Sequence, residues 1–90
     1  MKALKPSHRE KRRYLLISGK DTSMKSFDEA VLAFVGILGY AKASPMLVKA
    51  SGGKIIVSIN RSELEKIRAS LMLSGKDMRV ERVSGMINKL

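Results

Sequence analysis

The sequence predicts a small α+β domain in which one antiparallel sheet carries two helices on a single face. The length of 90 residues is enough for one small hydrophobic core, and 44% of the residues are hydrophobic, as in folded proteins. Two stretches repeat apolar residues with the 3.6-residue period of a helix. Four short runs rich in β-forming residues flank these stretches, so each helix is expected to connect two strands.

The first strand and the first helix are predicted from the amino-terminal half of the chain. Residues 14–18 form a short run of β-formers that ends at Gly19. Ser26, with Glu29 three residues later, is a capping box that predicts the start of a helix, and Gly39 is expected to end it. The apolar positions with helical spacing are Phe27, Ala30, Val31, Phe34 and Leu38.

The middle of the chain predicts a β-hairpin. Residues 46–50 and 54–59 are both rich in apolar and β-branched side chains, and they are separated only by a Ser-Gly-Gly turn at 51–53. If residues alternate along the second of these strands, Ile55, Val57 and Ile59 face the helices while Ile56 faces outward.

A second helix and a last strand complete the domain. Ser62 and Glu65 form another capping box, which opens a helix expected to stop at Gly75, and residues 79–83 follow as a strand. The resulting order, β-α-β-β-α-β, is that of the ferredoxin-like fold shared by RNA recognition motifs. The helices are expected to pack on the sheet through Phe27, Val31, Phe34, Leu38, Leu64, Ile67 and Leu71.

Positive charge is concentrated at the amino terminus. Eighteen Lys and Arg residues against eight Asp and Glu residues give a formal net charge of +10, which predicts a polyanionic partner. Much of this excess lies in residues 1–13, which we interpret as a basic arm that precedes a single domain over residues 14–90. Such an arm neutralises phosphates and gives affinity for RNA with little sequence information.

The residue types required for catalysis are scattered or absent. Cysteine is missing, and His8, the single histidine, lies in the basic arm where neighbouring charges disfavour a metal. Glu63 and Glu65 are two residues apart on the predicted helix and point to different faces. We therefore predict no catalytic residue, no metal site and no cofactor bound by the chain itself.

Two copies of Ser-Gly-Lys-Asp occur, at residues 18–21 and 74–77. Neither has the spacing of a phosphate-binding loop, and the two copies lie at non-equivalent places in the two halves of the fold. We interpret both as turns, in which glycine supplies a positive φ.

The compartment is inferred from what the sequence lacks. A chain without cysteine suits an intracellular protein. No apolar run is long enough for a signal peptide or a bilayer span. We expect a cytoplasmic protein that does not associate with membranes.

The outward face of the predicted sheet lacks the aromatic residues with which RNA recognition motifs stack bases, apart from Tyr14 on the first strand. Leu16 and Ile56 are the apolar residues expected on this face. We predict that they form a partner interface, either with protein or with a packed RNA backbone.

Three segments resemble the small protein subunit of ribonuclease P that is called protein component 2 in archaea and is shared with eukaryotes. They are KPSHREKRRY at residues 5–14, YAKASPMLV at 40–48 and VSGMINKL at 83–90. Together with the helix at 61–73 they are spread over nearly the whole length of the chain.

The resemblance implies a non-catalytic subunit of the ribonucleoprotein that removes the 5′ leader from precursor tRNA, with catalytic Mg²⁺ on the RNA. Its implied partners are ribonuclease P RNA, a larger barrel-fold protein subunit, other ribonuclease P proteins and the precursor tRNA substrate, with a possible homodimer. Another RNA-binding structural module, such as a ribosome-associated protein, is the alternative. The residues expected to bind RNA are Lys5, Arg9, Lys11, Arg12, Arg13, Tyr14, Lys42 and Lys89.

Overall fold

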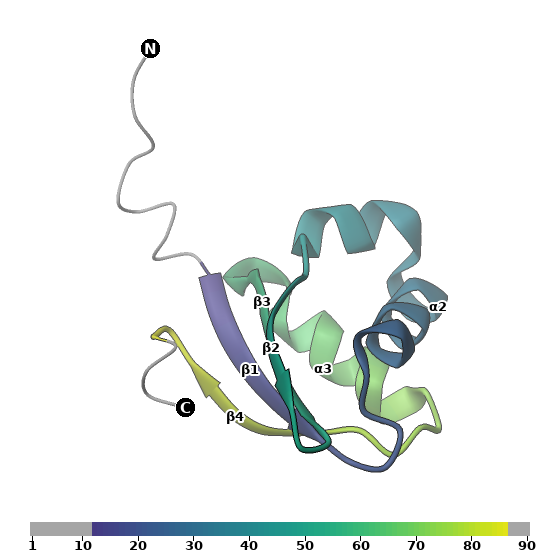
Figure 1. Ribbon diagram of the computed structural model, residues 1–90. Helices are drawn as coiled ribbons and strands as arrows, with labels where there is room; N and C mark the ends of the chain where they lie inside the picture. Colours follow the sequence, from purple (N-terminus) through teal and green to yellow (C-terminus); the bar gives the residue numbers. More distant parts are fainter. Residues whose placement is uncertain (1–11, 87–90) are drawn as a thin grey trace.

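The computed structural model of the protein describes residues 12–86 and contains one four-stranded antiparallel sheet (Figure 1). Its spatial order is β2-β3-β1-β4, so the first strand in the chain is central. The first strand begins two residues earlier than predicted. The strands are β1 (Arg12–Ser18), β2 (Met46–Ser51), β3 (Lys54–Asn60) and β4 (Arg79–Ser84).

Two helices cover one side of this sheet, as Figure 1 shows. They are α2 (Met24–Ala43) and α3 (Leu64–Leu73), and a 3-10 turn, η1 (Arg61–Glu63), precedes α3. The element order and the antiparallel pairing confirm the predicted ferredoxin-like fold.

Strict alternation along β1 and β3 places the core between the sheet and the helices. Leu15 and Ile17 on β1 are fully buried, and they pair in register with Val57 and Ile55 on β3. The prediction that Ile55, Val57 and Ile59 face the helices is confirmed by their burial. The helices fill the other side of this core with Phe27, Ala30, Val31, Ile67 and Leu71.

Helix α2 begins one turn earlier than predicted because Ser23, and not Ser26, is its N-cap. The Ser23 hydroxyl accepts a hydrogen bond from the backbone N–H of Ser26 at 3.1 Å. Since Ser26 is already inside the helix, the predicted capping box with Glu29 does not form.

A kink at Gly36 divides α2 into two segments that point in different directions (Figure 1). Gly36 has φ 76° and ψ −179°, a conformation that is almost restricted to glycine. The helix then continues through Gly39, which was expected to end it, as far as Ala43. Ser44 closes it in the left-handed conformation, and its N–H donates to the carbonyl of Tyr40 at 2.9 Å.

The kink overturns part of the predicted core. Phe34 is 49% exposed and Leu38 is 79% exposed, although both follow the helical period from Phe27. Leu38 is exposed because Gly36 changes the direction of the helix axis before it. Phe34 lies on the segment before Gly36 and lines a surface cavity next to α3 instead of entering the core. Leu64 is partly buried against the core, as the pattern predicted.

The second predicted capping box is also wrong. Asn60 caps the 3-10 turn, and its side-chain oxygen accepts a hydrogen bond from the N–H of Ser62 at 3.3 Å. Ser62 therefore lies inside η1, and α3 starts after Glu63 without a side-chain cap. The N-cap is therefore Asn60, the last residue of β3.

Each edge strand contains an irregularity that changes which side chains face outward. In β4 the register shifts between Leu16 and Ile17 of its neighbour, so that Val80 and Val83, three residues apart, both pack against the core. In β2 the shift between Leu47 and Lys49 brings Lys49 opposite Ile56. An unbroken register would have placed Val48 there and turned Lys49 toward the helix side.

Candidate functional site

The side of the sheet that faces away from the helices is not covered by any helix or strand of residues 12–86. We call this surface the open face. Its centre is apolar, because Leu16 on β1 and Ile56 on β3 pair directly across the two strands and are both partly exposed. Its central strands contribute Arg12, Tyr14, Leu16, Ser18, Lys54, Ile56, Ser58 and Asn60.

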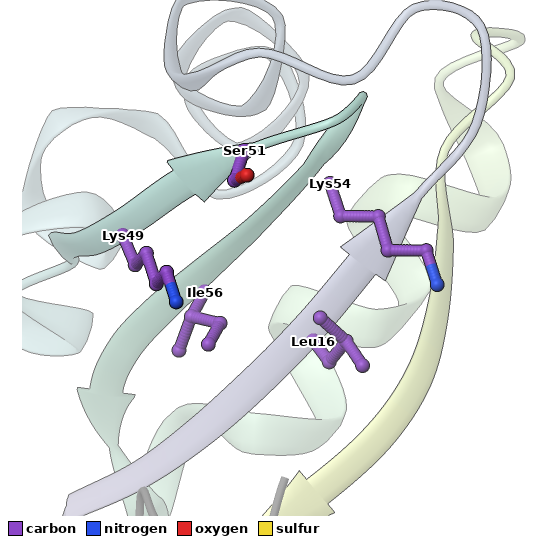
Figure 2. Close-up of a pocket in the computed structure, with 5 residues that line it drawn as sticks. All are labelled: Leu16, Lys49, Ser51, Lys54 and Ile56. Carbon is purple, nitrogen blue, oxygen red and sulfur yellow. The ribbon is translucent and has the colours of Figure 1, made fainter.

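A shallow pocket of about 160 Å³ lies at the end of the open face next to the β2–β3 turn. Its floor is formed by Leu16 and Ile56, and its border by Lys49, Ser51 and Lys54 (Figure 2). Figure 2 shows Lys49 extending from β2 toward Ile56, whereas Lys54 extends across the end of β1. The site thus combines an apolar floor with two cations from different strands.

The two lysines differ in their partners. The ammonium group of Lys54 lies 3.5 Å from the carboxylate of Glu81 on β4, and the Ser18 hydroxyl also donates to that carboxylate. These contacts, first of all the hydrogen bond from Ser18, lower the pKa of Glu81. Among the described residues Lys49 makes neither an ion pair nor a hydrogen bond. Lys49 is therefore the cation of this pocket that is available to an anion.

Arg12, which was predicted to bind RNA, makes hydrogen bonds at the end of the open face opposite the β2–β3 turn. Its Nε donates to Ser58 Oγ at 2.9 Å, and its Nη2 donates to the carbonyls of Ser58 at 2.9 Å and Ser44 at 2.8 Å. The guanidinium thereby joins β1 and β3 to the end of α2. The composition of the arm suggested only the charge of this residue, and not these internal contacts.

The other predicted RNA-binding residues do not form a single cluster in the described part of the chain. Tyr14 lies on the open face, opposite Ser58 and Ser84. Arg13 is on the same strand, and its Nη1 donates to the carbonyl of Arg12 at 2.9 Å. Lys42 is exposed in the last turn of α2. Lys5, Arg9, Lys11 and Lys89 lie outside the described residues.

A second apolar area, on the helices, was missed by the sequence analysis. Phe34 lines one cavity with Leu73 of α3 and another, of about 390 Å³, with Leu38 and Lys42. We call Phe34, Leu38 and Leu73 the helix surface; Leu73 is 69% exposed. The signal that could have revealed it is Gly36, which interrupts the apolar helical pattern between Phe34 and Leu38.

The two Ser-Gly-Lys-Asp turns bind each other and leave no phosphate cradle. The Asp77 carboxylate accepts from the N–H of Lys20 at 3.0 Å, and the Asp21 carboxylate accepts from the N–H of Asp77 at 2.7 Å. Gly19 and Gly75 both have positive φ, which confirms the interpretation as turns. Gly19 is also confined, because a Cβ there would lie 2.0 Å from the carbonyl oxygen of Asp77.

Within residues 12–86, no three histidine, cysteine or carboxylate side chains gather closely enough to hold a metal ion. In the same residues, neither helix is both long enough and apolar enough to span a bilayer.

The chain is similar to archaeal proteins named ribonuclease P protein component 2. Over an alignment of 106 positions, gaps included, it is 35% identical to the protein from Thermococcus gammatolerans, and this alignment covers 99% of this chain and 87% of that protein. It is 32% identical over 84 residues to the protein from Methanococcus maripaludis, and 35% identical over 80 residues to that from Methanococcus vannielii.

The alignments cover only part of the length of the Methanococcus proteins. It covers 84% of this chain but 64% of the protein from Methanococcus maripaludis, and 81% of this chain but 62% of that from Methanococcus vannielii. The chain therefore spans somewhat less than two thirds of these relatives. No family model matches the chain.

Proposed function

The chain belongs to the ribonuclease P protein component 2 family, and on that premise we propose that it is a non-catalytic protein subunit of ribonuclease P. In this role it binds and stabilises the catalytic RNA, and the particle removes the 5′ leader from precursor tRNA. The Mg²⁺ ions of the reaction are proposed to be held by the RNA, as the family resemblance implies.

The observation that carries the RNA-binding part of the proposal is the open face. It is a sheet surface that no helix or strand of residues 12–86 covers, on a chain of net charge +10, with Lys49 and Lys54 beside its apolar centre. Phosphates of an RNA backbone are neutralised by such lysines, and the apolar centre can pack against sugars and bases. We propose that RNA is the partner which covers Leu16 and Ile56.

The helix surface supports a separate contact with protein. Its side chains are more exposed than Leu16 and Ile56, and Lys42 and Lys66 border its larger cavity. We propose that the larger barrel-fold subunit covers it, with acidic residues facing the two lysines. Pairing of two copies of this chain stays a prediction.

Matched charge substitutions separate the two surfaces. We expect Leu38→Asp to weaken co-sedimentation with the barrel-fold subunit, because an unpaired carboxylate in an apolar contact is costly. Ile56→Asp should leave that assembly intact and weaken RNA binding instead. The opposite pattern would exchange the two assignments.

The alternative, a general RNA-binding module such as a ribosome-associated protein, is tested by competition. The purified chain is bound to labelled ribonuclease P RNA and challenged with an unlabelled unrelated RNA of the same length. Specific binding requires that ribonuclease P RNA competes at lower concentration than the unrelated RNA. Equal competition at several salt concentrations would favour the general module.

A further inference from the structure

We infer that the pocket over Leu16 and Ile56 holds one unpaired nucleotide of the RNA, with its base on these two side chains and its phosphate at Lys49. The inference rests on the proposed function and deepens it, because it names one subsite and the kind of RNA element that fills it. The occupant is a base that has left the double helix, since a base inside a helix is stacked on both faces by its neighbours.

The size and the floor of the pocket fit a single ring system. Its volume, about 160 Å³, is smaller than the roughly 300 to 1,000 Å³ of sites that enclose a whole small molecule. The floor consists of two aliphatic side chains that lie side by side across β1 and β3. A flat base can rest on such a floor through one of its faces, without hydrogen bonds that would select one base over another.

The border of the pocket supplies the complementary charge. Lys49 Nζ is directed toward Ile56 and has no partner among the described residues (Figure 2). Ser51 adds a hydroxyl beside it, while Lys54 remains paired with Glu81. A phosphate attached to the bound base is therefore expected to approach from the β2 side, where Lys49 has no competing carboxylate among the described residues.

A second copy of the chain is a poorer occupant of this pocket. A symmetric contact through the open face would bring Lys49 and Lys54 of one copy toward the same residues of the other. The ammonium group of Lys49 in each copy would then be buried close to like charge and without a partner among the described residues, at a cost that a small apolar floor does not offset. Charge complementarity thus favours a nucleic acid.

The pocket is tested with the full chain labelled at Leu and Ile methyl groups, using adenosine 5′-monophosphate as the probe and ribose 5-phosphate as the probe without a base. We expect the mononucleotide to shift the methyl resonances of Leu16 and Ile56, and ribose 5-phosphate to leave them unchanged. Leu38 on the helix surface is the internal reference.

Two variants with matched controls extend the test to a labelled single-stranded RNA of ten uridines. Ile56→Ala and Lys49→Ala should each weaken binding about threefold to tenfold. Met72→Ala, which removes an exposed apolar side chain from α3, and Lys25→Ala, which removes a charge from the start of α2, should change it less than twofold. Thermal unfolding of each variant establishes that it is folded.

Three results would overturn the subsite: unshifted Leu16 and Ile56 methyls, equal shifts with both probes, or binding by Ile56→Ala and Lys49→Ala that matches their controls. If the chain still supports cleavage of precursor tRNA in the reconstituted particle, such results reject the nucleotide pocket alone. Loss of that support would instead reject the proposed function.

Discussion

The hydroxyl of Tyr40 donates a hydrogen bond to Asp28 Oδ1 at 2.6 Å, although the two residues are twelve positions apart on the same helix. In a straight helix, twelve residues correspond to a rise of about 18 Å, which no side-chain hydrogen bond can span. The contact forms because the kink at Gly36 turns the second segment of α2 so that Tyr40 comes within reach of Asp28. The segment after the kink carries Leu38, which is 79% exposed and belongs to the helix surface.

Tyr40 is expected to ionise only in strong alkali. The hydrogen bond to Asp28, with partial burial and the charge of that carboxylate, raises the pKa of Tyr40 from 10.0 to about 12. Since the protonated hydroxyl is the stabilising form, its contribution is complete below pH 10 and is lost as pH rises toward 12. Ultraviolet titration of a Tyr14→Phe variant, which leaves Tyr40 as the remaining tyrosine, should give a midpoint near 12.

Asp28→Asn is the control for this titration, because it removes the charge and keeps the shape of the side chain. We expect the Tyr40 midpoint to fall toward 10.0 in this variant. A midpoint near 10.0 with Asp28 intact would show that the contact is absent in solution.

Gly36→Ala should disrupt the kink. The φ of 76° and ψ of −179° at Gly36 disfavour any residue with a Cβ, by about 1 to 3 kcal/mol. The variant is expected to lose stability by about that amount, or to straighten α2 and release Tyr40 from Asp28. Ala41→Ser, in the second segment of α2, is the control. Unchanged stability together with an unchanged Tyr40 titration would show that the helix does not depend on glycine at this position.

Arg12→Ala should destabilise the domain even without RNA. The guanidinium donates to Ser58 Oγ, to the carbonyl of Ser58 and to that of Ser44, and we expect its removal to cost about 1 to 3 kcal/mol. Arg12→Lys should recover only part of the lost stability, because an ammonium group cannot reproduce the planar arrangement of N–H donors in the guanidinium group. Denaturant unfolding of the three proteins measures the effect, and equal stabilities would contradict the structural role of Arg12.

Leu71 on α3 and Phe34 on α2 are expected to differ sharply in their contribution to stability, although the sequence predicts both as core residues. Leu71 is 2% exposed, so Leu71→Ala should cost about 2 to 5 kcal/mol. Phe34 is 49% exposed, so Phe34→Ala should cost about 1 kcal/mol or less and act mainly on binding to the protein partner. Similar losses at both positions would indicate that Phe34 is buried in the core in solution.

The sheet could be predicted from the sequence because its signals are local. The run of β-forming residues at 14–18 indicates the first strand, and the Ser-Gly-Gly turn indicates the hairpin. The helix boundaries are less predictable, because the sequence offers two serines that could cap the start of α2 and two glycines that could interrupt it. Ser23 competes with Ser26 as the cap, and Gly36 competes with Gly39 as the break.

The pocket depends on a register shift in β2, which the periodicity of the sequence does not indicate. Lys49 borders the pocket because the register of β2 shifts after Leu47; without the shift it would face the helices. Likewise, the composition of the arm marked Arg12 as a charge, whereas its partner Ser58 is 46 residues away along the chain. Contacts between distant segments could be found only from the folded structure.

Reconstitution of precursor tRNA cleavage tests the central claim most directly. Ribonuclease P RNA, Mg²⁺ and the barrel-fold subunit are assembled with and without this chain, and the rate and position of leader removal are measured. We expect the chain to increase the rate of cleavage at the mature 5′ end, and the chain without RNA to leave the substrate intact. Cleavage by the protein alone, or a rate unchanged by its addition to the assembled particle, would contradict its role as a non-catalytic subunit.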